Sequence, residues 1–320
     1  MYMSQPAESP LAPFPFERFR FTIKVAGLMV LPPYKGAVFR GAFGNAFRRI
    51  VCAVPGGDCG SCILRSKCLY ASVFEPRPPA SCPDAAKFDQ EPAPYVLNPP
   101  LTNRQAFHPG DTLEFDLVLI GPAIEALPYF IYAFTELGKR GLGRERGRFH
   151  LARVDLVRKE DSLPIYDGRT QMLSRYPPAV PPGPQMEEAC VTALTFHFLT
   201  PLRLQAKGKL VTELTFPIFF ERLAQRIVLL GTLYGSPAAL PDFSSLHVLA
   251  RDITITRNEL FWYDWARYSA RQKEVMRFGG LRGKISFSGN FGPFLPWLRL
   301  GEQVNAGQST TFGLGRYDIR

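Results

Sequence analysis

The segment Gly289-Asn-Phe-Gly-Pro-Phe-Leu295-Pro296-Trp297 has a counterpart earlier in the chain, Gly121-Pro-Ala-Ile-Glu-Ala-Leu127-Pro128-Tyr129. Both consist of a glycine, five further residues, and then Leu-Pro followed by an aromatic residue. Each follows a segment in which apolar and polar residues alternate, residues 111–120 in one case and 281–288 in the other. Each then leads through a helix and a glycine-rich loop to an aromatic-bearing strand. Because the agreement extends to the order of elements, an internal duplication explains it better than chance.

Each half of the chain is predicted to run strand–helix–strand–strand–helix–strand, the order of a ferredoxin-like or RNA-recognition domain. The sequence therefore predicts an α+β protein of two tandem ferredoxin-like (RNA-recognition-like) domains, the first with a small cysteine knuckle inserted at about 52–68. We place the first domain at 1–160 and the second, which carries the glycine-rich loop, at 187–320. Residues 161–186 hold six prolines and little periodicity, and are predicted to be a linker.

Charge and apolar content limit the classes of function. Lys and Arg number 38 against 28 Asp and Glu, a net charge of +10, which favours a polyanionic partner. The chain is 46% hydrophobic, yet no run reaches the roughly 18 apolar residues of a membrane span. Residues 1–15 lack a basic head followed by an apolar core, so no secretory signal is predicted. We expect a cytoplasmic protein with no membrane partner.

Four of the six cysteines lie within seventeen residues, spaced C-x6-C-x2-C-x5-C: Cys52, Cys59, Cys62 and Cys68. Without an export signal, this spacing argues for a metal site rather than a disulfide framework. Four soft ligands suit a closed tetrahedral zinc site, so a structural zinc is predicted. An iron–sulfur cluster uses the same ligand type and is the alternative. A closed site leaves no open coordination position, so no metal is expected to take part in catalysis.

Residues 34–51 are predicted to form a helix with a stripe of phenylalanines on one face. The opposite face carries Gly41, Gly44, Asn45, Arg48 and Arg49. It has small residues and positive charge but no acid. A face that is merely solvated normally mixes both signs of charge and avoids glycine. We interpret this face as one that meets RNA or phosphate.

The segment Asn305 to Tyr317 is predicted to be an anion-binding loop. Its glycines frame a run of small hydroxyl and amide residues, and no acid lies between Glu302 and Asp318. Backbone N–H groups in such a loop suit an anion, and Arg316 adds a planar donor. A structural turn before the last strand is the alternative. A second stretch, 138–148, has five basic residues to one acid. The candidate RNA-binding residues are Asn305, Gly307, Gln308, Ser309, Thr310, Thr311, Gly313, Gly315, Arg316, Lys139, Arg140 and Arg144.

With these features in place, the chain resembles the CRISPR-associated repeat-processing endoribonucleases of the RAMP superfamily over nearly its whole length. The most specific part is Ala306-Gly307-x5-Gly313-Leu314-Gly315, close to the family's C-terminal motif G-hydrophobic-G-x5-G-hydrophobic-G. The first glycine position of that motif is Asn305 here. The stretch from Phe39 to Arg49, with the cysteines after it, looks like a bacterial branch of the family. The resemblance implies binding of a CRISPR repeat stem-loop and metal-independent cleavage that leaves a 2′,3′-cyclic phosphate.

The expected active site departs from the family pattern. Many members place a general acid–base histidine in or near the first helix, and none of the four histidines of this chain lies there. Asn45 stands where relatives in this branch carry histidine, and an asparagine cannot exchange a proton near neutral pH. Tyr34 or Lys35 is the candidate proton-transfer group, and cationic groups would stabilise the pentacovalent phosphate. The candidate catalytic set is Tyr34, Lys35, Arg40, Asn45, Arg48 and Arg49.

Three hypotheses of function follow. The leading one is cleavage of precursor CRISPR RNA by attack of a 2′-hydroxyl, without a small-molecule cofactor. The second is a non-cleaving RNA-binding subunit of the same fold, which holds the guide RNA among the subunits of a CRISPR effector complex. The third is a zinc-stabilised scaffold whose basic surfaces serve only protein contacts. A strong loss of RNA affinity with rising salt separates the first two from the third.

Overall fold

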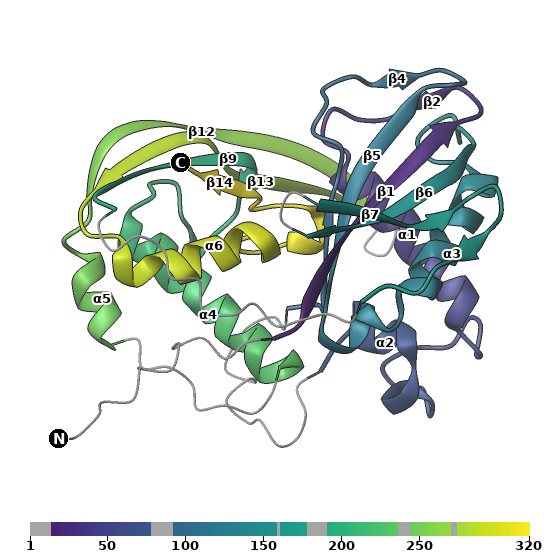
Figure 1. Cartoon of the computed structure of the whole chain (residues 1–320), viewed down its shortest axis with the longest axis horizontal. Coiled ribbons are helices and arrows are strands. Elements are labelled where there is room, and N and C mark those ends of the chain that lie inside the picture. Colours follow the sequence, from purple (N-terminus) through teal and green to yellow (C-terminus); the bar gives the residue numbers. More distant parts are fainter. Residues whose placement is uncertain (1–13, 78–91, 159–160, 178–190, 236–243, 270–273) are drawn as a thin grey trace.

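The computed structural model describes residues 14–77, 92–158, 161–177, 191–235, 244–269 and 274–320. Two α+β halves lie side by side, each with helices against one face of its own sheet (Figure 1). The halves correspond to the two predicted domains, and the prediction of tandem ferredoxin-like domains is confirmed. No described helix is long and apolar enough to cross a membrane.

The first domain has a six-stranded antiparallel sheet in the order β3-β5-β1-β6-β7-β8. Its strands are β1 (Phe16–Val25), β3 (Tyr95–Asn98), β5 (Thr112–Ile120), β6 (Phe149–Arg158), β7 (Asp161–Asp167) and β8 (Met172–Leu173). Helices α1 (Gly36–Val51) and α3 (Leu127–Arg140) cover one face. Residues of β1 alternate, so Phe19, Phe21 and Ile23 are buried against these helices while Arg18 and Arg20 point the other way.

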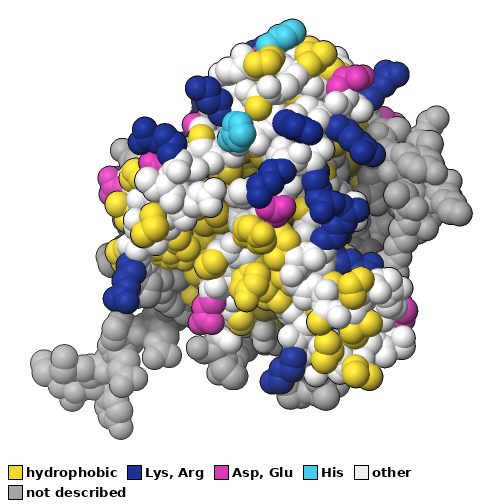
Figure 2. Space-filling view, turned by 90° about the vertical axis from the view of Figure 1, so that its right-hand side faces the viewer, with side chains coloured by type: hydrophobic (Ala, Val, Ile, Leu, Met, Phe, Trp, Pro, Cys, Tyr) yellow, Lys and Arg dark blue, Asp and Glu magenta, His cyan; other side chains and the backbone are white. Residues whose placement is uncertain are grey.

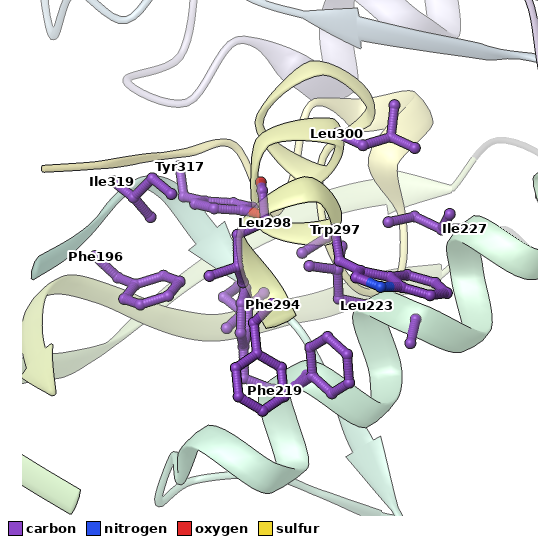
Figure 3. Close-up of a cluster of buried hydrophobic side chains, with 14 of the residues drawn as sticks. Phe196, Phe219, Leu223, Ile227, Phe294, Trp297, Leu298, Leu300, Tyr317 and Ile319 are labelled. Carbon is purple, nitrogen blue, oxygen red and sulfur yellow. The ribbon is translucent and has the colours of Figure 1, made fainter. Parts of the chain in front are cut away.

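The second domain has the sheet β12-β13-β9-β14. Its strands are β9 (Ala193–Leu202), β12 (Thr254–Ser269), β13 (Glu274–Ser288) and β14 (Tyr317–Ile319), and its helices are α4 (Phe216–Tyr234) and α6 (Leu295–Val304). Figure 3 shows the core between the two helices and the sheet, where Phe196 faces Phe219 and Trp297 packs against α4. Burying an aromatic or large aliphatic side chain stabilises the fold by about 1.5–3 kcal/mol.

Smaller elements complete the described chain. They are β2 (Met29–Val30), which pairs with β4 (Ala106–Phe107), η1 (Arg65–Lys67), α2 (Leu69–Phe74), η3 (Gly121–Ile124), β10 (Gln205–Ala206), β11 (Lys209–Leu210), α5 (Ser244–Ala250), η4 (Gly292–Phe294) and η5 (Thr310–Phe312).

The internal duplication predicted from the Leu-Pro-aromatic segments is visible in the topology. In both sheets the second, third, first and fourth strands of the ferredoxin-like order lie next to one another. The counterpart segments fold alike: a 3-10 turn precedes each helix, and Pro128 and Pro296 occupy the first turn of α3 and α6. Proline is well placed there because the first helical N–H groups have no partner within the helix.

The linker predicted at 161–186 is wrong in its first part, because residues 161–167 form β7 and 172–173 form β8. Ile165 and Tyr166 are buried in the first core. Pro164 is tolerated because the pairing of β7 with β6 shifts register between Val154 and Asp155, where the missing N–H interrupts no regular ladder. Residues 178–186 lie outside the described residues.

The two domains share a core. Phe14, Val96, Val118 and Ile120 belong to the first domain, yet they are buried in the same apolar cluster as the second domain's core. The outer face of the first sheet therefore packs, at one end, against the second domain. Such continuous burial holds the two halves in a fixed relation, unlike a flexible two-domain arrangement.

The loop before β14 is pressed against the start of α1. A Cβ atom on Gly36 would overlap the carbonyl oxygen of Phe312, so the helix backbone and η5 approach more closely than any larger residue allows. The Tyr34 hydroxyl donates a hydrogen bond to the same carbonyl at 2.7 Å. The sequence segments that carry the resemblance thus meet at this point.

Two alanine substitutions in α1 test this contact. Gly36→Ala is expected to lower the free energy of unfolding by roughly 1–3 kcal/mol, because the methyl group must push η5 away. Gly41→Ala meets nothing within 4 Å and is expected to raise it by about 0.8–1 kcal/mol through helix propensity. Urea unfolding followed by circular dichroism measures both, and equal effects at the two positions would contradict the close approach.

Candidate functional site

A cavity of about 460 Å³ lies where the two domains meet. The first domain lines it with Arg40 of α1, Phe74 of α2 and Tyr95 of β3. The second domain lines it with the loop 307–312, with α4, and with the turn between β10 and β11. The structure therefore brings the predicted glycine-rich loop and one residue of the predicted arginine helix to one place.

Positive charge dominates the cavity. The described residues that line it include Arg40, Lys207, Arg222 and Arg226 but no Asp or Glu. Arg226 is buried and already bound: its guanidinium donates to the carbonyls of Asn305 and Val304 at 3.1 and 3.0 Å, and burial lowers its pKa to about 10. Arg40 and Lys207 make no ion pair within the described residues, whereas Arg222 lies 3.5 Å from the carboxylate of Glu221. The lining as a whole is positive, so the cavity favours a negatively charged ligand.

Arg40 occupies a defined position in the cavity wall. Its guanidinium carbon lies 5.4 Å from the ring centre of Phe74 and 5.2 Å from that of Phe312, within the range of cation–π attraction. Its Nε atom is buried with no hydrogen-bond partner among the described residues. Two aromatic rings thus fix the guanidinium while part of its donor capacity is unused.

Tyr95 lies beside Arg40 and is fully buried. Its hydroxyl makes no hydrogen bond of normal geometry within the described chain. Burial raises the pKa of Tyr95 to about 12, although the neighbouring Arg40 acts in the opposite direction. At neutral pH the hydroxyl is therefore protonated and able to donate.

Five predicted RNA-binding residues line the cavity, namely Gly307, Gln308, Ser309, Thr310 and Thr311. They supply amide and hydroxyl groups next to Arg40. The Gln308 amide nitrogen donates to the Gln205 side-chain oxygen at 3.0 Å, which ties the loop to β10. Their assignment as RNA contacts stays a prediction, and the geometry places them where such contacts would be made.

The glycines of the loop allow its backbone conformation and its close packing. Gly313 and Gly315 have φ of 80° and 70°, the left-handed region that favours glycine. A Cβ atom on Gly315 would overlap the Ala306 carbonyl oxygen, and one on Gly313 would overlap Pro99. The close approach is made by the chain's own backbone, as it is at Gly307 against Arg203. The assignment of these three glycines as RNA contacts stays a prediction, and of the three Gly307 lines the cavity.

Asn305 and Arg316 are bound between the domains. Asn305 is 0% exposed, and its amide nitrogen donates to the Asn98 side-chain oxygen at 2.9 Å and to the Leu314 carbonyl at 3.0 Å. The Arg316 guanidinium lies 3.5 Å from the carboxylate of Asp116, a buried acid. Neither residue lines the cavity. A buried asparagine cannot reach RNA, so this predicted contact is wrong, and Arg316 is engaged by an acid.

Tyr34 and Lys35 anchor the start of α1. The Tyr34 ring packs on Trp265 at 4.8 Å, and burial raises the pKa of its hydroxyl well above the usual value. Lys35 is 0% exposed, and its ammonium donates to the carbonyls of Pro33 and Thr102 at 3.1 and 2.5 Å. Burial lowers the pKa of Lys35 to about 8. Neither side chain lines the cavity, so the predicted proton-transfer role of this pair is not supported by the geometry.

The other predicted catalytic residues of α1 do not line the cavity. Arg48 donates to the Gly57 carbonyl at 2.8 Å and lies over the ring of Tyr70, while Asn45 and Arg49 are exposed. At 3.6 residues per turn, Arg49 lies about 180° around the helix from Arg40. Of the six predicted catalytic residues, Arg40 alone lines the cavity, and the assignment of all six stays a prediction.

The basic stretch after α3 forms part of the protein surface. Lys139, Arg140 and Arg144 are exposed, and Lys139 is paired with Glu136 at 2.6 Å. They do not line the cavity. Figure 2 shows the face of the first domain, where Lys and Arg side chains outnumber acids and surround a patch of hydrophobic side chains. These three residues stay predicted RNA contacts.

Sequence reasoning missed the cavity residues of the second domain. Arg222, Gln225 and Arg226 are spaced i, i+3 and i+4 on a helix that is otherwise strongly apolar. This spacing places them on one face, and such a polar stripe is the signal that would have found them. Tyr95 gave no comparable signal, since an aromatic residue in a strand is common in any core.

The four cysteines lie in the segment after α1, half-buried and without disulfides. Burial raises the pKa of Cys59, and neighbouring Cys52 and Cys68 act in the same direction. Within the described ranges, no group of three or more His, Cys, Asp or Glu side chains is arranged to hold a metal. The donor type fits zinc, but the thiols are not gathered as a ligand set, so the zinc site stays a prediction.

Tandem ferredoxin-like domains with a glycine-rich loop before the last strand are the fold of the RAMP proteins. Residues 196–317 match the family model of CRISPR-associated endoribonuclease Cas6, and residues 14–178 match the model AF_1859_N, described as an N-terminal domain. The first domain therefore carries an AF_1859_N domain, and most of the second domain matches the Cas6 endoribonuclease model. The first matched range ends after β8 and the second begins within β9, so the two matches divide the chain where it passes from one sheet to the other.

Individual relatives agree with this assignment. An uncharacterized protein of Archaeoglobus fulgidus is 25% identical, over 91% of this chain and 93% of its own length. A Cas6 product complex has 16% identity and a TM-score of 0.57, over 95% of this chain and 100% of that chain. A chain of a partial Cas6-RT-Cas1–Cas2 complex has 14% identity and a TM-score of 0.59, over 98% of this chain. This chain spans about half (47%) of the length of that one. These structural likenesses show the fold.

The zinc prediction is tested by elemental analysis of protein purified without added metal. About one zinc per chain is expected, because four thiolates within one short segment satisfy a tetrahedral ion. Cys62→Ser should lower the zinc content and the melting temperature together. Colourless, folded protein without metal would contradict the prediction, and a brown protein would favour the iron–sulfur alternative.

Proposed function

We propose that this protein binds CRISPR repeat RNA and cleaves precursor CRISPR RNA at the cavity between its two domains. The observation that carries the proposal is the set of three cations, Arg40, Lys207 and Arg222, around a space with no acid in its described lining. Hydroxyl and amide groups of the loop 308–311 lie beside them. The match to the Cas6 endoribonuclease model supports RNA as the anion.

The proposed reaction is an internal displacement at phosphorus. The 2′-oxygen of one nucleotide attacks the adjacent phosphorus, its proton passes to solvent, and the bond from phosphorus to the 5′-oxygen breaks. The leaving oxygen takes up a proton, so the products carry a 2′,3′-cyclic phosphate and a 5′-hydroxyl. Arg40, held between two rings, would stabilise the extra negative charge of the pentacovalent state. The cavity cations supply this charge, so the proposal requires no metal ion.

The second candidate, a non-cleaving RNA-binding subunit, has one specific observation in its favour. The described cavity lining holds no His, Asp, Glu or Cys, so no side chain there exchanges a proton near neutral pH. General acid–base help is typically worth about 10²–10⁴-fold in rate. The likeness to a Cas6-RT-Cas1–Cas2 complex supports other CRISPR proteins as partners in this case.

Arg40→Ala distinguishes binding from cleavage. In EDTA, with the protein in molar excess over repeat RNA from its own locus, the substitution is expected to slow cleavage by about 10²–10³-fold, because it removes charge from the pentacovalent state. The loss of affinity should be smaller, about one phosphate contact. Gel analysis of single-turnover reactions measures the rate, and a single 2′-deoxy substitution at the cut site should block cleavage while RNA stays bound.

Arg169→Ala is the matched control. This arginine is 91% exposed in the turn between β7 and β8, and it lies outside the cavity. Its loss removes the same charge and is expected to leave the cleavage rate within about twofold of wild type. Equal loss of rate in both variants would contradict the role of Arg40. RNA binding without any cleavage by wild type would favour the non-cleaving subunit.

The pH dependence of cleavage tests Lys35. A general base with a pKa of about 8 must be deprotonated, so the rate would rise with pH and level off near pH 8. The ammonium is instead held by carbonyls, and Tyr95 stays protonated up to a pKa of about 12. We therefore expect the single-turnover rate to keep rising from about pH 6 to 9 as the 2′-hydroxyl ionises more readily. A plateau near pH 8 would restore Lys35 as the base.

A further inference from the structure

Helix α4 and the turn between β10 and β11 form the part of the cavity lining that we call the α4 wall. It presents Arg222 and Gln225, one helical turn apart, and Lys207. These residues belong to neither the glycine loop nor the first helix. They come from the second domain, whereas Arg40 and Tyr95 come from the first, so a ligand that fills the cavity touches both domains.

Two buried donors around this space have no acceptor in the described chain, the Nε atoms of Arg40 and Arg222, and the Tyr95 side chain near Arg40 is 0% exposed. Arg222 is otherwise held by Gln225, whose side-chain oxygen accepts from it at 2.8 Å, and it lies 3.5 Å from Glu221. A buried donor without an acceptor costs about 1–3 kcal/mol. Donors of this kind from both domains indicate a ligand rich in oxygen acceptors.

The size and the lining of the cavity limit the class of ligand that it can hold. The volume of about 460 Å³ falls in the range of about 300–1,000 Å³ that holds a small ligand, and it is too small for base-paired RNA. The apolar parts of the wall include Pro92 and Leu229, and side-chain amides are contributed by Gln225 and Gln308. An inorganic anion uses neither feature. One unpaired nucleotide uses all of them, because it joins phosphate oxygens to a flat base with hydrogen-bonding edges.

We propose that the α4 wall binds one unpaired ribonucleotide of the RNA, with Arg222 at a phosphate and Gln225 at a base edge. This inference rests on the proposed function and specifies which part of the RNA the cavity takes. Arg222 and Gln225 are in this view residues that determine affinity and base preference, while Arg40 of the first domain acts on the reacting phosphate. The nucleotide bridges the two domains.

The test measures binding of fluorescent rA, rU and rC homopolymers of about ten nucleotides, and of a fully paired RNA hairpin, by anisotropy at several salt concentrations. Arg222→Ala is expected to weaken homopolymer binding about tenfold and to flatten the plot of log affinity against log salt by about 0.7, the value of one phosphate on a single strand. Gln225→Ala should leave this slope unchanged and bring the three homopolymer affinities within about twofold of one another.

Arg251→Ala is the matched control, since Arg251 is exposed, carries the same charge and does not line the cavity. It should leave affinity and slope as in wild type, and melting temperatures should show that all variants fold. If Arg222→Ala and Arg251→Ala behave alike while wild type binds the repeat RNA, the inference is overturned and the proposed function stands. If wild type binds no RNA, the proposed function itself is overturned.

Crosslinking gives a second readout that needs no variant. Repeat RNA from the protein's own locus is prepared with 4-thiouridine at one unpaired position at a time, and crosslinked peptides are identified by mass spectrometry. At least one unpaired position is expected to crosslink to a peptide from residues 216–234. Crosslinks confined to other parts of the chain would overturn the α4 wall as the nucleotide site.

Discussion

The contact between the Phe312 carbonyl and the start of α1 is the constraint on which the site depends. The Tyr34 hydroxyl binds this oxygen, and Gly36 lets the helix backbone lie next to it. Trp265 of β12 packs on Tyr34, so the long hairpin of the second domain holds the same point from another side. With η5 fixed in this way, the Phe312 ring lies beside Arg40 and completes one wall of the cavity.

Buried polar groups between the domains decide which cations remain for a ligand. Asp116, which is 4% exposed, is paired with Arg20 at 3.0 Å and with Arg316 at 3.5 Å. A buried charge is costly unless it is paired, so these arginines satisfy the protein's own acid. Arg226 likewise satisfies backbone carbonyls. The arginine of the loop, Arg316, is therefore engaged by the protein's own acid, and Arg40 and Arg222 are the arginines that we propose for a ligand.

The described lining of the cavity carries positive charge but lacks a side chain suited to general acid–base catalysis. Its cations suit a phosphate whose negative charge grows during reaction, and its described lining holds no His, Asp, Glu or Cys. An enzyme of this kind gains from electrostatic stabilisation and gives up acid–base assistance. The same lining also suits a protein that holds its RNA after cleavage or without it, which is why rate and affinity have to be measured separately.

The sequence by itself determined the fold, because the duplicated Leu-Pro-aromatic segments and the alternating strands are local patterns with a period set by the backbone. It also located the glycine loop and the first helix, both of which line the cavity.

Only the tertiary structure decided which side chains of those elements are available. Asn305 and Lys35 were taken for site residues, but each is buried and bound by groups distant in sequence, Asn98 and Thr102. Arg222 was overlooked because α1, which lines the same cavity, lies almost two hundred residues away in the chain. Contacts between such distant segments follow from packing of the two domains, and no local pattern records them.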